Sequence, residues 1–348
     1  MAKQIFMNYS LNTNSKWIYC NYPEKLPADA LADKSGYCLN RVQDVNGSGQ
    51  IFYSYNNNQI GRSIKFGVTV YNPNRATVTL TRTNYGHSDS QKDGGWKEVA
   101  GVSWKRFFAS SSKQFTIPSG KVTWICEEDI PEGVIFSGNL RFTTSAPVTV
   151  SVFVFESKWD IPDATTVYPF VPVEGKGNQY SGYGNGYFLT ASEITIKLSD
   201  LVKNGEIYFI TNDRMSRDST VNNIGSRSEI IPIYINDKYT ADPNLPDGAP
   251  LGNLGNWCTQ YFIPVKLVND IGGTRKVKCR IVAEKRNNVV TKYPVVNCGG
   301  NISFDEITQP GSELLFNTVS VTDTTKFNYQ YILGTNSGGF VSHRFSLV

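Results

Sequence analysis

The chain has 348 residues, 40% of them hydrophobic and 18% charged, and its 34 basic and 30 acidic residues leave a formal net charge of +4. This length predicts about two domains, each large enough to bury a core. The small basic excess is spread along the chain, which argues against a nucleic-acid-binding protein with a concentrated basic stripe. No stretch approaches the roughly 20 apolar residues of a membrane helix, and the N-terminus lacks the apolar core of a signal peptide. We therefore expect no membrane span and synthesis in the cytosol.

The residue types favour β-structure. The chain has 19 tyrosines and 19 phenylalanines but only 3 methionines, and aromatic residues suit half-buried pleated surfaces. We predict an all-β protein of two tandem antiparallel β-sandwich domains, of the jelly-roll or immunoglobulin-like type, with one short helix in the first domain. The predicted domains cover residues 1–160 and 188–348, and a linker rich in Pro, Gly and Tyr covers residues 161–187.

The N-terminal segment contains two apolar-aromatic runs, Ile5–Tyr9 and Trp17–Tyr22. The first run is predicted either as the opening strand of its own sheet or as an arm that adds to the exposed sheet edge of a neighbouring copy.

Two segments with period-two alternation follow, Ile64–Tyr71 and Thr77–Arg82, separated by Asn72-Pro73-Asn74. This pattern predicts an antiparallel pair with one solvent-exposed face. Apolar side chains then fall at helical spacing, which predicts an amphipathic helix over residues 96–110. A strand, the turn Ile117-Pro118-Ser119-Gly120 and closing strands complete the first domain.

The second half repeats this order with different residues. A strand pair over residues 261–268 and 276–283 precedes an insert, a Gln309-Pro310-Gly311-Ser312 turn and two closing strands. The repetition indicates two tandem modules, although strand-rich sandwiches also converge on such patterns. Asn204-Gly205, between two apolar runs, predicts a further hairpin at the start of the second module.

One part of the first domain resembles a known family. An alternating strand, Asn-Pro, a Thr/Val strand, a Trp/Phe segment, an Ile-Pro-Ser-Gly turn, the run Ser-Gly-Asn-Leu-Arg-Phe-Thr-Thr and a Val-rich closing strand follow one another over residues 50–156. This order resembles β-sandwich domains of surface proteins from spore-forming bacteria, which occur beside copper-amine-oxidase-like N-terminal domains. The resemblance implies an envelope-associated β-sandwich and transfers no catalytic residue. The missing leader departs from the secreted pattern of that family.

No motif indicates a reaction, so we expect a protein that is not an enzyme and has no cofactor or metal site. The two histidines, His87 in the polar segment 84–89 and His343 near the C-terminus, are both expected to be exposed in loops. His87 and Asp89 with a serine would suit a hydrolytic triad, but the sequence lacks a Gly-x-Ser-x-Gly context.

Two acidic clusters are the nearest approaches to a catalytic or metal site. Asp93 and the run Glu127-Glu128-Asp129 would be the paired carboxylates of a glycosidase. The segment from Asp242 to Gly248 resembles a calcium loop but misses the EF-hand spacing. Such clusters are usually solvated turns, and we expect neither site.

Exposed aromatic side chains are stronger candidates for a binding surface. They would either stack on sugar rings, as in carbohydrate-binding sandwiches, or pack in the core and at interfaces, where Trp and Tyr are enriched. Together with the N-terminal run, the candidate assembly or ligand contacts are Ile5, Phe6, Tyr9, Trp96, Trp104, Trp159, Tyr180, Tyr183 and Tyr187.

The six cysteines are predicted either as buried free thiols or as partners in disulfides within or between subunits. None lies in a Cys-x-x-Cys motif, so a zinc ribbon is not expected. The candidates are Cys20, Cys38, Cys126, Cys258, Cys279 and Cys298.

Two functional hypotheses follow from these features. The first is a non-enzymatic bacterial structural protein that self-assembles through β-edge and aromatic contacts into a coat, fibre, surface layer or inclusion. Its partner would be a further copy of itself, and it would end in a spore, surface or extracellular assembly. The second is a β-sandwich module that binds a carbohydrate or a cell surface.

Overall fold

The computed structural model describes residues 2–32, 36–158, 181–212, 257–284, 292–335, 337 and 341–348. The chain divides into two compact units. The N-terminal unit consists of Thr13–Tyr187 and Pro232–Gly252, and the C-terminal unit consists of Met1–Asn12, Phe188–Ile231 and Asn253–Val348. Each unit has its own apolar core, and the predicted all-β, sandwich-type fold is confirmed.

This division departs from the predicted domains at two places. The first 12 residues belong to the C-terminal unit, because β1 (Lys3–Gln4) pairs with β13 and β2 (Tyr9–Leu11) pairs with β11. At the other boundary, Ser181–Asn185 of the predicted linker forms β10, which pairs with β3 of the N-terminal unit.

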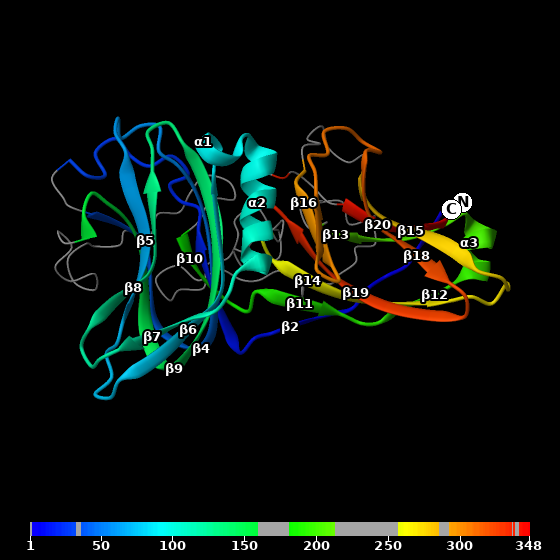
Figure 1. Ribbon diagram of the computed structural model, residues 1–348, viewed down its shortest axis with the longest axis horizontal. Helices are drawn as coiled ribbons and strands as arrows, with labels where there is room; N and C mark the ends of the chain where they lie inside the picture. The colour runs from blue at the N-terminus through cyan, green and yellow to red at the C-terminus, as the bar shows by residue number, and fades with distance from the viewer. Residues whose placement is uncertain are drawn as a thin grey trace, which may run out of the picture. The chain divides into compact units, whose positions relative to one another are not determined.

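The N-terminal unit is built around one eight-stranded sheet in the order β10-β3-β4-β9-β5-β8, with β6 paired to β9 and to β7. Helices α1 and α2 lie between β6 and β7 in the chain, and α2 runs along β6 and β9 (Figure 1). The elements are β3 (Ser15–Cys20), β4 (Gly36–Asn56), β5 (Ile64–Tyr71), β6 (Val78–Asp89), α1 (Ser90–Asp93), α2 (Trp96–Ala109), β7 (Lys113–Ile117), β8 (Val122–Ile130), β9 (Ile135–Phe155) and β10 (Ser181–Asn185).

Two long strands, β4 and β9, bend together and enclose the core of this unit. Their pairing shifts register near Val45, where Asp44 and Gly47 have φ angles of 53° and 74°. Irregularities of this kind bend a strand and increase its twist. One part of β9 therefore pairs with β5 and the other with β6.

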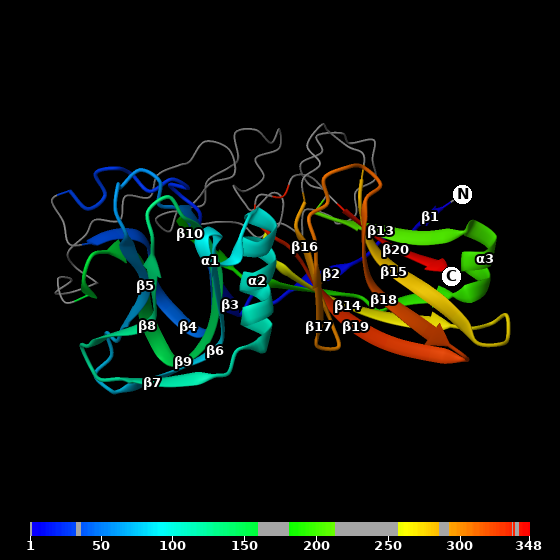
Figure 2. The same ribbon diagram turned by 45° about the horizontal axis from the view of Figure 1, so that its top comes forward.

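The C-terminal unit contains two sheets. The five-stranded sheet has the order β1-β13-β20-β15-β18, and the seven-stranded sheet has the order β17-β16-β19-β14-β11-β2, with β12 paired to β14. Strands β1 and β20, near the two chain ends, both lie beside α3 (Figure 2). The remaining elements are β11 (Phe188–Ala191), β12 (Ile194–Lys197), α3 (Leu198–Asn204), β13 (Glu206–Thr211), β14 (Gln260–Val268), β15 (Arg275–Ala283), β16 (Pro294–Cys298), β17 (Asn301–Phe304), β18 (Glu313–Val321), β19 (Thr324–Leu333) and β20 (Val341–Leu347).

The two units share a nested strand pairing. In the N-terminal unit β5 pairs with β8 and β6 pairs with β7. In the C-terminal unit β14 pairs with β19 and β15 pairs with β18. Each unit also places its insert after the second strand of this set, the two helices in one and the hairpin β16–β17 in the other. The repeated order of segments therefore corresponds to a repeated connectivity of the jelly-roll kind.

The predicted pairing of neighbouring strands is wrong in both units. Strands β5 and β6 do not pair with each other, and β14 and β15 belong to different sheets. The period-two alternation identifies which face of a strand is buried, but it carries no information about the strand that pairs with it. In addition, four of the pairs, β1–β13, β3–β4, β11–β14 and β12–β14, are parallel.

The helix over residues 96–110 is confirmed as α2, while the hairpin at Asn204-Gly205 is wrong. Leu198 and Leu201 are buried at helical spacing, so the segment between β12 and β13 forms α3. Gly205 follows the helix with a φ of 72°, a conformation that favours glycine at a helix end.

Candidate functional site

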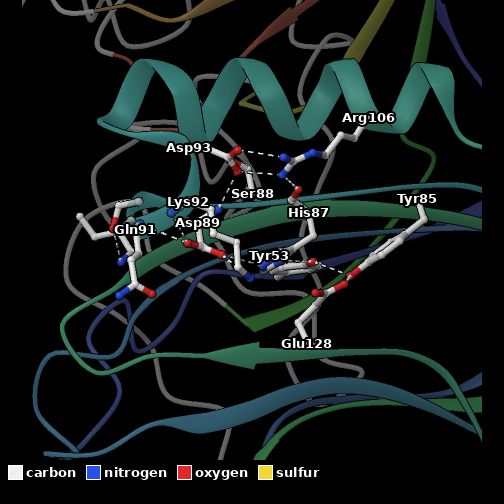
Figure 3. Close-up of polar contacts among 12 residues, drawn as sticks. Tyr53, Tyr85, His87, Ser88, Asp89, Gln91, Lys92, Asp93, Arg106 and Glu128 are labelled. Atoms are coloured by element: carbon white, nitrogen blue, oxygen red, sulfur yellow. Dashed lines mark hydrogen bonds and ion pairs between the residues drawn. The ribbon is translucent and has the colours of Figure 1, made fainter.

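A polar cluster lies in the N-terminal unit where β6 ends and α1 begins, beneath α2 (Figure 3). Asp89, the last residue of β6, caps α1, because its Oδ1 atom accepts hydrogen bonds from the backbone N–H groups of Gln91 at 3.1 Å and Lys92 at 2.9 Å. Aspartate is favoured at this position because it satisfies amide donors that have no partner inside the helix. The cap directs the chain from the sheet into the helices.

The backbone of α2 packs unusually close to the backbone of β6 at Gly86. A Cβ atom added to Gly86 would lie 1.9 Å from the carbonyl oxygen of Ser103 and 2.4 Å from the backbone nitrogen of Phe107. Only glycine allows this distance between strand and helix. The amide of Asn84 also donates to the carbonyl of Phe107 at 3.1 Å.

His87 lies at the centre of the cluster and is 7% exposed, so the expectation of an exposed loop histidine is wrong. The polar segment around it continues β6, and the ring points away from α2, toward Tyr53 and Phe136 in the core of the unit (Figure 3). Its Nδ1 atom is 3.0 Å from the hydroxyl of Tyr53, and its Nε2 atom is 3.9 Å from Oδ2 of Asp89. Burial lowers the pKa of His87 to about 4, so the ring is neutral at neutral pH.

The hydrolytic triad considered from the sequence is not assembled. Ser88 donates its hydroxyl to Asp93 at 2.8 Å, and the group bonded to His87 is the phenol of the fully buried Tyr53. A nucleophile must reach its substrate, which this arrangement does not allow. The cluster therefore serves to join α1 and α2 to the sheet.

Asp93 and Arg106 form the main ion pair of this joint. The guanidinium donates two hydrogen bonds to the carboxylate, at 2.7 Å and 2.8 Å, and Nη1 also bonds to the carbonyl of His87 at 2.7 Å. Burial opposes ionisation of Asp93, but the hydrogen bonds from Arg106 and Ser88 outweigh it and the pKa lies below the usual value. The bidentate geometry is the strong form of such a pair.

The acidic run on β8 does not form a catalytic carboxylate pair. Glu127 and Asp129 both contact Lys65, at 3.7 Å and 2.6 Å. Glu128 instead accepts a hydrogen bond of 2.5 Å from the hydroxyl of Tyr85, and burial raises its pKa. Successive residues of a strand point to opposite faces, which separates Glu128 from Glu127 and Asp129.

A second polar cluster, which sequence patterns did not reveal, lies on the outer face of the five-stranded sheet of the C-terminal unit. Arg280 on β15 and Arg344 on β20 are directly opposite each other, and both donate to Glu206 at 2.5 Å. Arg280 also bonds to Glu313 and Arg344 to Glu284, each at 2.7 Å. These five residues line a pocket with a volume of about 460 Å³. The alternation of side chains along β15 and β20 puts both arginines on the outer face of the sheet. The sequence does not show that the two strands are neighbours, and only their pairing brings the arginines together.

His343 on β20 is also buried, against the expectation of exposure. Its Nε2 atom is 3.0 Å from the hydroxyl of Thr211, and its Nδ1 atom is 2.9 Å from the hydroxyl of Tyr329. The ring stacks on Phe209 with a centroid distance of 4.5 Å. Burial lowers the pKa of His343 to about 3, so this histidine is a neutral core residue.

The described candidate aromatic residues of the N-terminal unit do not form one exposed surface. Trp104 and Tyr187 are buried, at 1% and 5% exposure, because the apolar stripe of α2 faces the sheet and the hydroxyl of Tyr187 bonds to Ser48 at 2.6 Å. Trp96 and Tyr183 are half-buried. Trp159 and Tyr180 lie outside the described residues.

The N-terminal run is used inside its own molecule. Ile5 packs against the core, and its backbone N–H bonds to the carbonyl of Tyr208 at 2.8 Å. Tyr9 belongs to β2, and its ring makes an edge contact with Tyr261 at 5.4 Å. Phe6, between the two strands, is 60% exposed.

All six cysteines are buried, and no disulfide joins any two of them within the chain. Burial raises the pKa values of Cys20, Cys38 and Cys126 to about 12. Thiols of this kind are poor nucleophiles.

Neither a metal cluster nor a membrane helix is found in the described part of the chain. It contains no group of three or more His, Cys, Asp or Glu residues placed to hold a metal ion. The segment that resembles a calcium loop, from Asp242 to Gly248, lies outside the described residues. No described helix is long and apolar enough to cross a membrane.

Comparison with known proteins identifies no family. No family model and no curated protein matches the chain. The chain has a weak structural resemblance to CUB and other β-sandwich domains. The CUB1-EGF-CUB2 domains of rat MASP-1 are 8% identical, with 93% of this chain and 98% of that chain covered and a TM-score of 0.16. A Paenibacillus xanthan lyase is 13% identical, with 90% and 23% covered and a TM-score of 0.17. TM-scores this low support no inference about function.

Proposed function

We propose that this chain is a non-enzymatic structural protein that associates with further copies of itself through the open edge of the five-stranded sheet. The observation that carries this proposal is β18, which stands at the end of that sheet and pairs only with β15 among the described residues. An edge strand presents a row of unpaired backbone N–H and C=O groups that a strand from another molecule can join.

The composition of β18 suits strand addition. Its nine residues, Glu-Leu-Leu-Phe-Asn-Thr-Val-Ser-Val, include one charged residue and no proline. Edge strands in natural proteins are usually protected by lysine, proline, a short length or a β-bulge. Of these features, β18 has only an irregularity in its pairing, opposite Cys279 and Arg280. Leu315 on this strand is 49% exposed, so an added strand would cover apolar as well as backbone surface.

The other edge of the same sheet also carries an exposed apolar side chain. It is formed by β1, and Phe6 follows this strand at 60% exposure. Contact between unlike edges of successive copies would build a filament or a closed ring of several copies, whereas contact between two β18 edges would close into a dimer. The resemblance of residues 50–156 to surface domains of spore-forming bacteria favours an extended assembly at a cell or spore surface.

The proposal is tested by light scattering after size-exclusion chromatography and by electron microscopy over a range of protein concentrations. We expect concentration-dependent oligomers of the natural protein that are lost in Leu315→Lys, because a charge at the edge opposes strand addition. Val202→Lys is the matched control, since Val202 is a 62% exposed apolar residue on α3. A natural protein that stays monomeric, or a Leu315→Lys variant that assembles normally, would contradict the proposal.

Phe6→Lys distinguishes the two geometries. Loss of assembly in both Phe6→Lys and Leu315→Lys indicates contact between unlike edges. Loss in Leu315→Lys alone, with a dimer as the largest natural species, indicates contact between two β18 edges.

A further inference from the structure

The pocket on the outer face of the five-stranded sheet has the features of a ligand site. It has a volume of about 460 Å³ and lies where β15 and β18 meet the turn before β18. Small-molecule sites commonly have volumes of about 300–1,000 Å³ and combine apolar walls with a few polar groups. Its lining residues are Glu206, Arg280, Val282, Ala283, Glu284, Pro310, Gly311, Glu313 and Arg344.

The charges of the lining exclude an anionic ligand. Three glutamates stand against two arginines, so the lining carries one net negative charge. Both guanidinium groups are already held by carboxylates in an alternating chain that runs from Glu313 through Arg280, Glu206 and Arg344 to Glu284. An anion would have to displace these carboxylates and would be repelled by them.

Two carboxylates retain hydrogen-bonding capacity. Glu284 uses Oε1 for Arg344 and Ser342, and Glu313 uses Oε2 for Arg280. The second oxygen of each has no hydrogen-bond partner among the described residues. These oxygens accept hydrogen bonds and favour a positively charged donor.

The remaining wall is apolar. Val282 and Pro310 line the pocket with apolar side chains, and Gly311 and Ala283, whose methyl group packs in the core, line it with backbone. An aliphatic chain can lie along such a wall while its charged end reaches a carboxylate, as lysine and arginine side chains do at protein surfaces.

We propose that this pocket binds an alkyl cation, a primary ammonium or guanidinium group on an aliphatic chain, with Glu313 and Glu284 as acceptors. The source is either a free amine or guanidine or the side chain of a basic peptide. The site lies within the C-terminal unit and needs no second copy of the chain, although Glu313 is the first residue of β18, the proposed assembly edge.

The proposal is tested by calorimetric titration of the full chain with n-butylguanidinium and n-butylammonium chloride. Neutral n-butylurea, which has the shape of the guanidinium probe, and sodium butyrate are the control ligands. We expect at least one of the two cations to bind and both controls to fail. N-acetyl-arginine amide separates the two sources, because it binds only if the pocket accepts a side chain attached to a peptide backbone.

Glu313→Gln is the test variant, because Glu313 is 45% exposed and its replacement should leave the sheet intact. We expect it to weaken binding of the better cation about tenfold, through loss of a charge-assisted hydrogen bond. Glu193→Gln is the matched control, since Glu193 is 42% exposed and forms an ion pair with Lys326 elsewhere in the same unit. The proposal is overturned if neither cation binds, if butylurea or butyrate binds as well as the cations, or if Glu313→Gln binds them normally.

Discussion

The hydroxyl of Tyr53 and the Nδ1 atom of His87 lie 3.0 Å apart, in a hydrogen bond buried in the core of the N-terminal unit. Because His87 is only 7% exposed, water hydrates its charged form poorly. The bond therefore joins strand β4 to the end of β6 and also makes the stability of the N-terminal unit depend on pH.

We expect the free energy of unfolding to fall as pH drops below about 6.5. The unfolded chain takes up a proton at each histidine near pH 6.5, whereas His87 and His343 in the folded chain stay neutral down to about pH 4 and pH 3. The contribution of the two histidines to the free energy of unfolding is therefore complete above about pH 6.5. Between pH 6.5 and the pKa of each histidine in the folded chain, it falls by about 1.4 kcal/mol per pH unit. Urea unfolding between pH 5 and 7.5 measures the slope, and His87→Gln should reduce it by the share of one histidine. An unchanged slope in this variant would contradict the assignment.

Gly86→Ala should destabilise the N-terminal unit by about 3 kcal/mol or more, because the added methyl group overlaps the backbone of α2 at Ser103 and Phe107. Gly95→Ala, at the residue directly before α2, is the control. A Cβ atom there meets only a side-chain oxygen of Glu98 at 3.4 Å, so we expect a loss below about 1 kcal/mol. Chemical denaturation of the two variants measures the difference, and equal losses would rule out the close approach as the cause.

Arg106→Gln should loosen α2 at its C-terminal half, because it removes the bidentate contact with Asp93. Arg106 is 48% exposed, so solvent screening limits the expected loss to about 1–2 kcal/mol. Hydrogen exchange of the α2 amides measures this local effect. Lys97→Gln changes an exposed ion pair with Glu98 on the same helix and should leave the exchange rates unchanged. Equal exchange rates in the two variants would contradict the role of the Asp93–Arg106 pair in holding α2 on the sheet.

Lys292→Met should stabilise the C-terminal unit by about 1–3 kcal/mol. Lys292 is 0% exposed, its ammonium group has no hydrogen-bond partner among the described residues, and burial lowers its pKa. Methionine keeps the length of the side chain and removes the buried charge. Thermal unfolding compares it with Lys276→Met at an exposed position of β15. A lower melting temperature for Lys292→Met alone would show that the ammonium group has a stabilising role.

The thiols should resist modification in the folded protein. All six cysteines are buried, and raised pKa values keep Cys20, Cys38 and Cys126 protonated at neutral pH. Titration with a thiol-reactive dye should therefore detect all six only after denaturation, and reductant should not change the oligomeric state. Fast labelling of the native protein, or dissociation by reductant, would contradict this expectation.

Local pattern was sufficient for the features that depend on a single segment. Alternation identified the strands over residues 64–71 and 77–82, which are β5 and part of β6. Helical spacing of Trp96, Val99 and Trp104 identified α2, because burial of one face follows from the period of the segment itself. The class of fold followed from the same signals.

Features that depend on contact between distant segments were decided by the tertiary structure. The polar neighbours of His87 suggested a loop, but the ring lies in the core of the unit against Tyr53 and Phe136. Arg280 and Arg344 line the same pocket only because β15 and β20 lie side by side. The sequence by itself determined which residues prefer to be buried and in which local conformation, since these preferences act between neighbours in the chain. Strand partners, the burial of both histidines and the place of β18 at the end of its sheet among the described strands were determined by the packing of whole sheets, which no local pattern encodes.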